Sequence, residues 1–336
     1  EPPAGATRIH DAVVAGATPA ERRGQIAQAQ TGAGQGAAVL TMPDSIAWML
    51  NIRGADIPRN PVVQAFATVD AQGRVGLYAD PAKFDTQVRA HLGNEVTIAP
   101  PDRFTAALAA LEGPVRLDAD TAPEAVFRAL EQAGIEITRE RDPVALPKAR
   151  KTTAELEGMR AAHRRDAVAM IRALSWIDAR QPGSFTEIDV VRALEGFRRE
   201  AGAIDISFDT ICGSGPNGAI VHYRVNEATN RGVAPGELLL IDSGAQYADG
   251  TTDVTRTVAT GPAQPPAEAV RAFTLVVEGL SAMSRLRWPE GLAGSHLDAV
   301  ARAALGATAT KAGDPKNATR GPPPVKGPPC AAARAR

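Results

Sequence analysis

Residues 238–257, LLLIDSGAQYADGTTDVTRT, contain the pattern that decides the fold of the second half of this chain. Four apolar residues predict a buried strand that ends on Asp242. The ADG that follows favours a turn, and the β-branched residues after it predict a returning strand that contains Asp253. We therefore expect the two aspartates on neighbouring strands, close enough to share a cation.

A carboxylate placed directly after four apolar residues is costly to bury without a partner. It requires an arginine, a set of backbone donors or a metal ion. One interpretation is a buried Asp–Arg pair, with Arg256 as the partner and Asp249 as a plain turn residue. The other is a divalent-cation site, although two carboxylates are few for a hard cation, which takes about six oxygen ligands. Spacing alone leaves both interpretations open.

His222 lies in the segment 214–223, SGPNGAIVHY. Its glycines and proline predict a tight loop, followed by a strand over Ala219–Tyr223. An isolated histidine is more often structural than catalytic, but beside a metal site an imidazole can hydrogen-bond a developing oxyanion. The remaining histidines fit structural roles: we expect His163 to be packed, and we expect surface positions for His10, His91 and His296.

Composition limits the classes of partner. The chain has 336 residues, of which 44% are hydrophobic, enough for two domains with sizeable cores. With 37 basic and 38 acidic side chains, charge gives no reason to expect nucleic acid or an anionic membrane as partner. The apolar runs are too short to cross a bilayer. Two cysteines, Cys212 and Cys330, cannot build a disulfide framework, so we expect a cytoplasmic protein.

The N-terminal part, residues 1–143, alternates between helical and strand-like patterns, which predicts an α/β layer domain. Asp44 is a plausible N-cap for one of these helices. The expected helices cover 21–30, 44–50, 81–92, 103–111 and 123–133, and the expected strands cover 37–41, 62–69, 74–78, 96–98, 115–118 and 135–138.

A proline-containing connection at 141–150 leads into a second domain, residues 144–305. A long amphipathic helix is expected at 153–179, with Leu156 and Ile171 on its apolar stripe, and further helices at 186–201, 270–286 and 296–305. From Gly306 onward the composition changes: these 31 residues include six prolines and eight alanines but a single acid. Such a segment predicts either a disordered basic tail or an out-of-frame translation.

Taken together, these segments resemble the Xaa-Pro aminopeptidases (aminopeptidase P) of the creatinase-like "pita-bread" metallopeptidase family. The closest match is DISFDTICGSGPNGAIVHYRVNEATNRG at 205–232, followed by GELLLIDSGAQYADGTTDVTRTVATG at 236–261. Upstream, LTMPDSIAWMLNIRGADIPRNPVVQAFATV at 40–69 resembles the domain that precedes the catalytic one. The resemblance covers about residues 25–305.

The resemblance implies an α/β N-terminal creatinase-like domain followed by an α+β pita-bread catalytic domain. It implies two divalent metal ions, usually manganese, with Asp242 bound to one metal and Asp253 bridging both. It makes His222 a residue that contacts substrate and transition state without binding metal. The implied activity is release of the N-terminal residue from peptides with proline second, by an enzyme that is commonly a homodimer.

The sequence also departs from the family pattern. The family completes its site with a histidine from a HGxGHG-like loop and two later glutamates, yet no histidine follows His296 and no glutamate follows Glu290. Because the chain also begins without methionine, we expect it to be truncated at both ends, with an incomplete catalytic domain that is inactive and exposes apolar surface. The alternatives are a non-catalytic peptide-binding module, or a prolidase that cleaves dipeptides.

Overall fold

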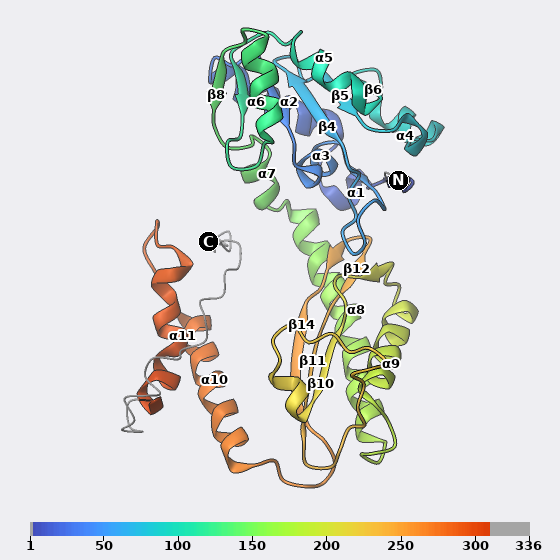
Figure 1. The fold of residues 1–336 in the computed structure, drawn as a ribbon, viewed down its shortest axis with the longest axis vertical. Helices are drawn as coiled ribbons and strands as arrows, with labels where there is room; N and C mark the ends of the chain where they lie inside the picture. Colours follow the sequence, from blue (N-terminus) through green and yellow to red (C-terminus); the bar gives the residue numbers. More distant parts are fainter. Residues whose placement is uncertain (1–2, 310–336) are drawn as a thin grey trace.

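The computed structural model describes residues 3–309. Within these residues the chain forms an N-terminal unit and a second unit, joined through the long helix α8 (Thr153–Asp178) (Figure 1). Each helix of the described residues is too short or too polar to span a bilayer.

The N-terminal unit is a layered α/β domain, as predicted. Six of its described strands form a mixed sheet in the order β6-β5-β4-β2-β7-β8, and two more, β1 (Arg8–Ile9) and β3 (Ile52–Arg53), pair separately. Helices cover both faces: α2, α3 and α4 pack on one core, whereas α5 and α6 pack on the other. The strands are β2 (Ala37–Leu40), β4 (Phe66–Asp70), β5 (Val75–Tyr78), β6 (Val96–Ala99), β7 (Val115–Leu117) and β8 (Ile137–Arg139), and the helices are α2 (Pro19–Gly32), α3 (Pro43–Met49), α4 (Thr86–Leu92), α5 (Phe104–Leu108) and α6 (Glu124–Gln132).

Several details of this domain differ from the sequence prediction. The strand expected at 62–69 begins only at Phe66. Asp44 is not an N-cap: α3 begins one residue earlier, at Pro43, and Asp44 pairs instead with Lys148. The helix expected at 81–92 is divided into the 3-10 turn η1 (Pro81–Lys83) and α4, because the Asp85 carboxylate accepts the backbone N–H of Val88 and so begins a new helix.

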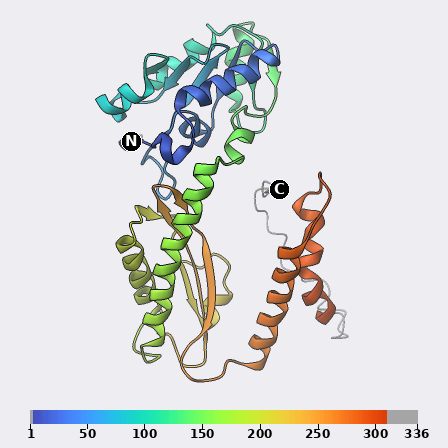
Figure 2. The ribbon, with the colours of Figure 1, turned by 180° about the vertical axis from the view of Figure 1, so that it is seen from behind.

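In the second unit, α8 and α9 (Glu187–Glu200) pack on one face of a three-stranded antiparallel sheet in the order β10-β11-β14 (Figure 2). Alternate residues of the central strand, Leu239 and Ile241, enter this core, while Leu240 and Asp242 point to the opposite face. The strands are β10 (Ile211–Ser214), β11 (Leu238–Ser243) and β14 (Val254–Ala259), and a small neighbouring sheet contains β9 (Asp205–Ile206), β12 (Ala245–Tyr247) and β13 (Gly250–Thr251).

The buried stripe of α8 differs from the expected one. Leu156 and Ile171 are exposed, and the buried positions include the small residues Ala162, Ala169 and Ala173. Small side chains allow the hairpin of β12 and β13 to approach closely: a Cβ added at Gly250 would lie 2.9 Å from the Cβ of Ala162. Close approach of the backbone, rather than burial of long side chains, therefore joins α8 to the hairpin.

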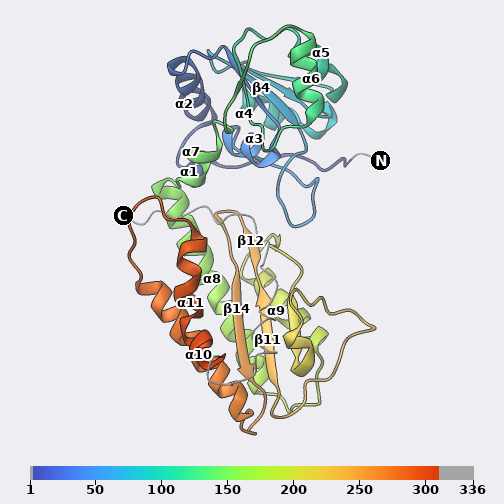
Figure 3. The ribbon, with the colours of Figure 1, turned by 60° about the vertical axis from the view of Figure 1, so that its left-hand side comes forward.

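The last described helices, α10 (Ala267–Arg285) and α11 (Gly294–Ala309), pack against each other and stand apart from the three-stranded sheet (Figures 1 and 3). Along α10, large apolar side chains remain exposed: Val270, Phe273, Val276, Val277 and Leu280. Helix α11 continues past Gly306, so the first residues of the expected tail are helical, and 310–336 lie outside the described residues.

The connection at 141–150 contains a short helix, α7 (Ala145–Ala149), and contacts tie the two units together. Arg22 pairs with Glu155 of α8 at 2.9 Å, and the Thr152 hydroxyl donates to the carbonyl of Ala15 at 3.1 Å. Arg59, in a loop of the N-terminal unit, pairs with the exposed carboxylates of Asp205 and Asp209.

A buried ion pair joins α8, α9 and the hairpin of β12 and β13. Arg198 donates twice to Asp166, at 2.8 and 3.0 Å, and the Tyr247 hydroxyl donates to the same carboxylate at 3.1 Å. Both charged side chains are almost completely buried. Burial and the neighbouring Asp166 charge raise the pKa of Tyr247 well above its usual range, so the hydroxyl stays a donor.

Replacing Asp166 by alanine is expected to lower the free energy of unfolding by about 3–5 kcal/mol, because it leaves the buried Arg198 guanidinium unpaired. Urea unfolding measures the loss. The control is Glu200→Ala, which removes the exposed pair with Arg172 and should change the free energy of unfolding by less than about 1 kcal/mol. Equal effects of the two substitutions would contradict the structural role of the buried pair.

Candidate metal centre

Asp242 and Asp253 lie on one face of the sheet, opposite the face that α8 and α9 cover. Asp242 is paired across the strands with Thr255, and Asp253 precedes Thr255 by two residues, so its side chain points to the same face. The Thr255 hydroxyl donates to Asp242 at 2.8 Å. The hairpin thus brings together the two carboxylates that the sequence pattern placed on neighbouring strands.

These two carboxylates carry like charge without a cationic partner. Partial burial, the negative charge of Asp242 and a hydrogen bond to Asp242 raise the pKa of Asp253. Within residues 3–309 neither carboxylate forms an ion pair. The interpretation as a pair with Arg256 is wrong, because that guanidinium donates to the carbonyl of Thr255 at 2.7 Å. Asp249 is more than a turn residue, because it pairs with Arg165 of α8.

The pair fits part of a divalent-cation site. Carboxylate oxygens are ligands that hard cations prefer, and two facing negative charges are relieved by a cation between them. Within the part of the chain that the structure describes, no third histidine, cysteine, aspartate or glutamate joins the cluster. Asp242 and Asp253 therefore supply two ligands, and the rest of a coordination shell must come from water or from other residues.

The segment that contains His222 differs from the prediction. Residues 219–223 do not form a strand; the 3-10 turn η3 (Gly215–Ala219) leads into a tight turn, in which His222 is exposed and has a φ of 58°. The 3-10 turn η3 folds back over β10. A Cβ added at Gly213 of β10 would lie 2.7 Å from the backbone of Asn217 in η3. Glycine at this position therefore permits the close approach.

This segment lies on the same face of the sheet as the aspartates, because Gly213 pairs with Leu240, two residues before Asp242. Among the described residues, no hydrogen bond or ion pair joins His222 to either aspartate. The structure brings the loop of His222 to the face that carries the aspartates without bringing its imidazole into contact with the carboxylates.

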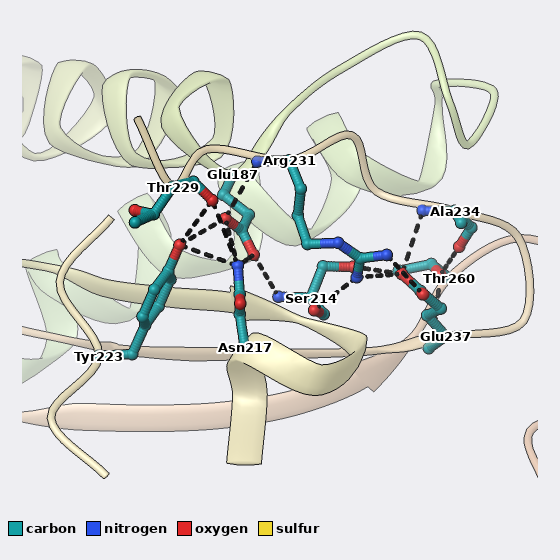
Figure 4. A network of polar contacts seen from close by, with 9 residues as sticks. All are labelled: Glu187, Ser214, Asn217, Tyr223, Thr229, Arg231, Ala234, Glu237 and Thr260. Carbon is teal, nitrogen blue, oxygen red and sulfur yellow. Dashed lines mark hydrogen bonds and ion pairs between the residues drawn. The ribbon is translucent and has the colours of Figure 1, made fainter. Parts of the chain in front are cut away.

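A buried glutamate that sequence reasoning missed holds this loop. Glu187, in the first turn of α9, is fully buried and accepts from the backbone N–H of Ser214 at 2.7 Å, from the Asn217 amide at 3.0 Å and from the Tyr223 hydroxyl at 3.0 Å (Figure 4). The backbone N–H of Arg231 adds a longer contact at 3.3 Å. An acid in the first turn of a helix is ordinary in sequence, so no local signal indicates this role.

A second polar group holds the end of the loop. Arg231 forms a bidentate pair with Glu237, at 2.8 and 2.9 Å, and the Ser214 hydroxyl donates to the same carboxylate at 2.8 Å (Figure 4). The hydrogen bond from Arg231 is the main cause that lowers the pKa of Glu237. Residues 214–237 are thus fixed at several points, with His222 between the anchors.

Replacing Glu187 by alanine is expected to loosen residues 214–231, because it leaves the buried N–H of Ser214 without its acceptor, at a cost of about 1–3 kcal/mol, and removes one acceptor each from Asn217 and Tyr223. Hydrogen exchange should show faster amide exchange in this loop than in β11. The Glu187→Gln variant keeps an acceptor oxygen and should have a smaller effect.

Glu195→Ala serves as the matched control, since Glu195 lies on the same helix but accepts from Thr210, outside the loop. If both alanine variants leave exchange in 214–231 unchanged, Glu187 does not hold the loop.

Two family descriptions match this chain. Residues 1–155 match the Creatinase/Prolidase N-terminal domain, and residues 157–317 match Metallopeptidase family M24. The boundary between the matches falls at the start of α8, where the structure joins its two units.

Similar proteins bear related names. The Aspergillus niger protein named "Probable Xaa-Pro aminopeptidase P" is 38% identical over 314 residues, which cover 90% of this chain and 51% of the relative. Aminopeptidase P2 of Arabidopsis thaliana is 35% identical over 339 residues, covering 91% of this chain and 47% of the relative. The chain spans about half the length of the curated relatives it matches.

Solved structures agree in fold. The X-prolyl aminopeptidase of Caenorhabditis elegans, described as a cytosolic enzyme with a di-nuclear active site, superposes with a TM-score of 0.83 at 30% identity, covering 90% of this chain and 51% of that one. The Xaa-Pro dipeptidase of Bacillus anthracis shares the fold at 23% identity, with a TM-score of 0.68, covering 87% and 78%. The chain belongs to the creatinase-like proteins of metallopeptidase family M24. Its creatinase/prolidase N-terminal domain is followed by sequence of the family M24 domain, which has the pita-bread fold.

Proposed function

We propose that the function of this chain is that of a divalent-metal-dependent aminopeptidase, which releases the N-terminal residue from peptides with proline in second position. The observation that carries the proposal is the uncompensated pair of carboxylates, Asp242 and Asp253, on the face of the sheet that α8 and α9 leave open. The names of the similar proteins from Aspergillus niger and Caenorhabditis elegans support the same activity.

In this proposal Asp242 would hold one metal ion and Asp253 would be shared between two. Manganese suits such oxygen ligands. Two cations held there would lower the pKa of a bound water and would polarise the scissile carbonyl. The protein contributes the fixed hairpin that keeps the carboxylates side by side, and the Thr255 hydroxyl, which orients Asp242.

His222 is assigned to the substrate rather than to the metal. Its side chain is exposed, and its loop is anchored by Glu187 and by the pair of Arg231 with Glu237. An imidazole N–H presented in this way can donate to the oxygen that gains charge in the transition state. The held loop keeps the ring on the carboxylate face of the sheet.

We also propose a cytoplasmic location and a homodimer. The cytoplasmic location is supported by the description of the Caenorhabditis elegans structure as a cytosolic enzyme and by the single, buried free cysteine among the described residues, Cys212. The homodimer rests on the family resemblance. We further propose that this chain alone has little or no activity, because two carboxylates fill only a small part of the coordination shells of two hard cations.

Manganese binding tests the site. Calorimetric titration of the metal-free chain is expected to show weak binding that falls at least about tenfold in Asp242→Asn and in Asp253→Asn, since each removes one of two charged ligands. Asp249→Asn is the matched control, because Asp249 lies in the same hairpin but is engaged by Arg165. Unchanged manganese affinity in both aspartate variants, or an equal loss of affinity in the control, would contradict the assignment of Asp242 and Asp253 as metal ligands.

Peptide hydrolysis tests the specificity. Any turnover by the manganese-loaded protein should be faster for a tripeptide with proline second than for the corresponding dipeptide, and chromatography of the products measures both rates. His222→Gln should lower kcat with little change in manganese affinity, because the histidine acts on substrate. Faster cleavage of the dipeptide would favour the prolidase alternative.

A further inference from the structure

A cavity of about 310 Å³ lies where the two units meet. Its walls include the β1 strand (Arg8–Ile9) and the β3 strand (Ile52–Arg53) of the N-terminal unit, the start of α8, and the hairpin residues 246–251. Asp242, Asp253 and His222 do not line it. It is therefore separate from the proposed metal centre.

The acids that line this cavity are already engaged. Asp44 pairs with Lys148, and Asp249 pairs with Arg165. Glu155 accepts from Arg22 at 2.9 Å and also from the backbone N–H of Thr152 at the start of α8. All three are thus engaged in ion pairs, and only the charge of Glu155 also acts on Arg53, against the arginines around it.

Three cations that line the cavity have no such partner. Arg8, Arg53 and Lys151 form no ion pair within residues 3–309. Arg8 and Arg53 stand directly opposite each other in the register of β1 with β3, an arrangement in which like charges destabilise a strand pair. Arg53 donates through one nitrogen to the carbonyls of Ala47 and Ile52, at 3.3 and 2.9 Å, and meets no carboxylate.

Neighbouring groups in the cavity reflect the same excess of positive charge. His10 was expected on the surface; instead it is half-buried, and burial together with Arg53, Arg22 and Arg8 lowers its pKa to about 4. Burial, Arg22 and Arg8 lower the pKa of Arg53 to about 10, and the charge of Glu155 opposes this shift only in part. Trp48, also in the lining and 8% exposed, has a buried indole N–H without an acceptor in the described structure.

We propose that this cavity binds a small oxyanion, a ligand that presents a carboxylate or phosphate group to Arg8 and Arg53. The paired N–H donors of a guanidinium group match the oxygens of a carboxylate or of a phosphate. A negative ligand also removes the repulsion between the facing arginines. The volume suits a small ligand, since binding pockets begin at about 300 Å³. Because Lys151 at the foot of α8 lines the same cavity, the bound anion stabilises the junction of the two units.

Thermal unfolding of the whole chain without added divalent metal tests this site. Phosphate and citrate are compared with sodium chloride at matched ionic strength, because a ligand that binds only the folded state raises the midpoint with its concentration. We expect a rise with phosphate, citrate or both that sodium chloride does not reproduce and that Arg8→Gln loses, since the general stabilisation by such salts would be the same in the variant. A rise with one anion alone identifies which group the site takes.

Arg8→Gln is the decisive variant, since the Arg8 side chain is exposed and forms no hydrogen bond or ion pair in the described structure, so folding should survive its loss. Its affinity for the anion should fall at least tenfold in a calorimetric titration. Arg103→Gln, an exposed cation outside the cavity, should leave the affinity unchanged.

The proposal is overturned if the midpoint follows ionic strength alone, or if Arg8→Gln and Arg103→Gln weaken binding equally. The metal centre is not involved in this measurement, so failure here leaves the manganese titration unaffected, and failure of that titration leaves this site unaffected.

Discussion

The two-residue period of the central strand β11 is the constraint on which the second unit depends. Leu239 and Ile241 are buried against α8 and α9, so Leu240 and Asp242 must face the other way. A shift of the register by one residue would carry Asp242 into the apolar core, where an unpaired carboxylate is costly. Packing on one face thus fixes the side on which the chemistry can occur.

Stability and proposed function are divided between the two faces. On the covered side, the Asp166–Arg198 pair joins both helices to the hairpin through Tyr247. On the open side, Asp242 and Asp253 repel each other, and the His222 turn has a left-handed backbone. Such local strain persists only where surrounding structure over-determines it. The hydrogen bonds to buried Glu187 and the ion pair of Arg231 with Glu237 supply that support for the loop.

Sequence patterns predict those parts of the structure that depend on interactions between residues close together in the chain. The hairpin that carries Asp242 and Asp253 was predictable because apolar residues, a turn and a β-branched stretch occur within twenty residues. Asp44 was misassigned because its tertiary partner, Lys148, lies far along the chain. The His222 segment was misassigned because η3 folds back onto Gly213, and neither the role of Glu187 nor the cationic cavity has a signature within one stretch of sequence.

The most direct measurement of the central claim is thermal unfolding of metal-free protein and its Asp253→Asn variant from about pH 3 to about pH 7. An acid whose pKa is higher in the folded than in the unfolded chain holds its proton more tightly when folded, so stability falls as the pH rises from the ordinary aspartate value through the raised one. The account predicts a variant more stable than the parent near pH 7, with a difference that disappears at the acid end. A variant that is less stable near pH 7 would show that Asp253 serves the fold, and would contradict an uncompensated carboxylate pair held ready for a cation.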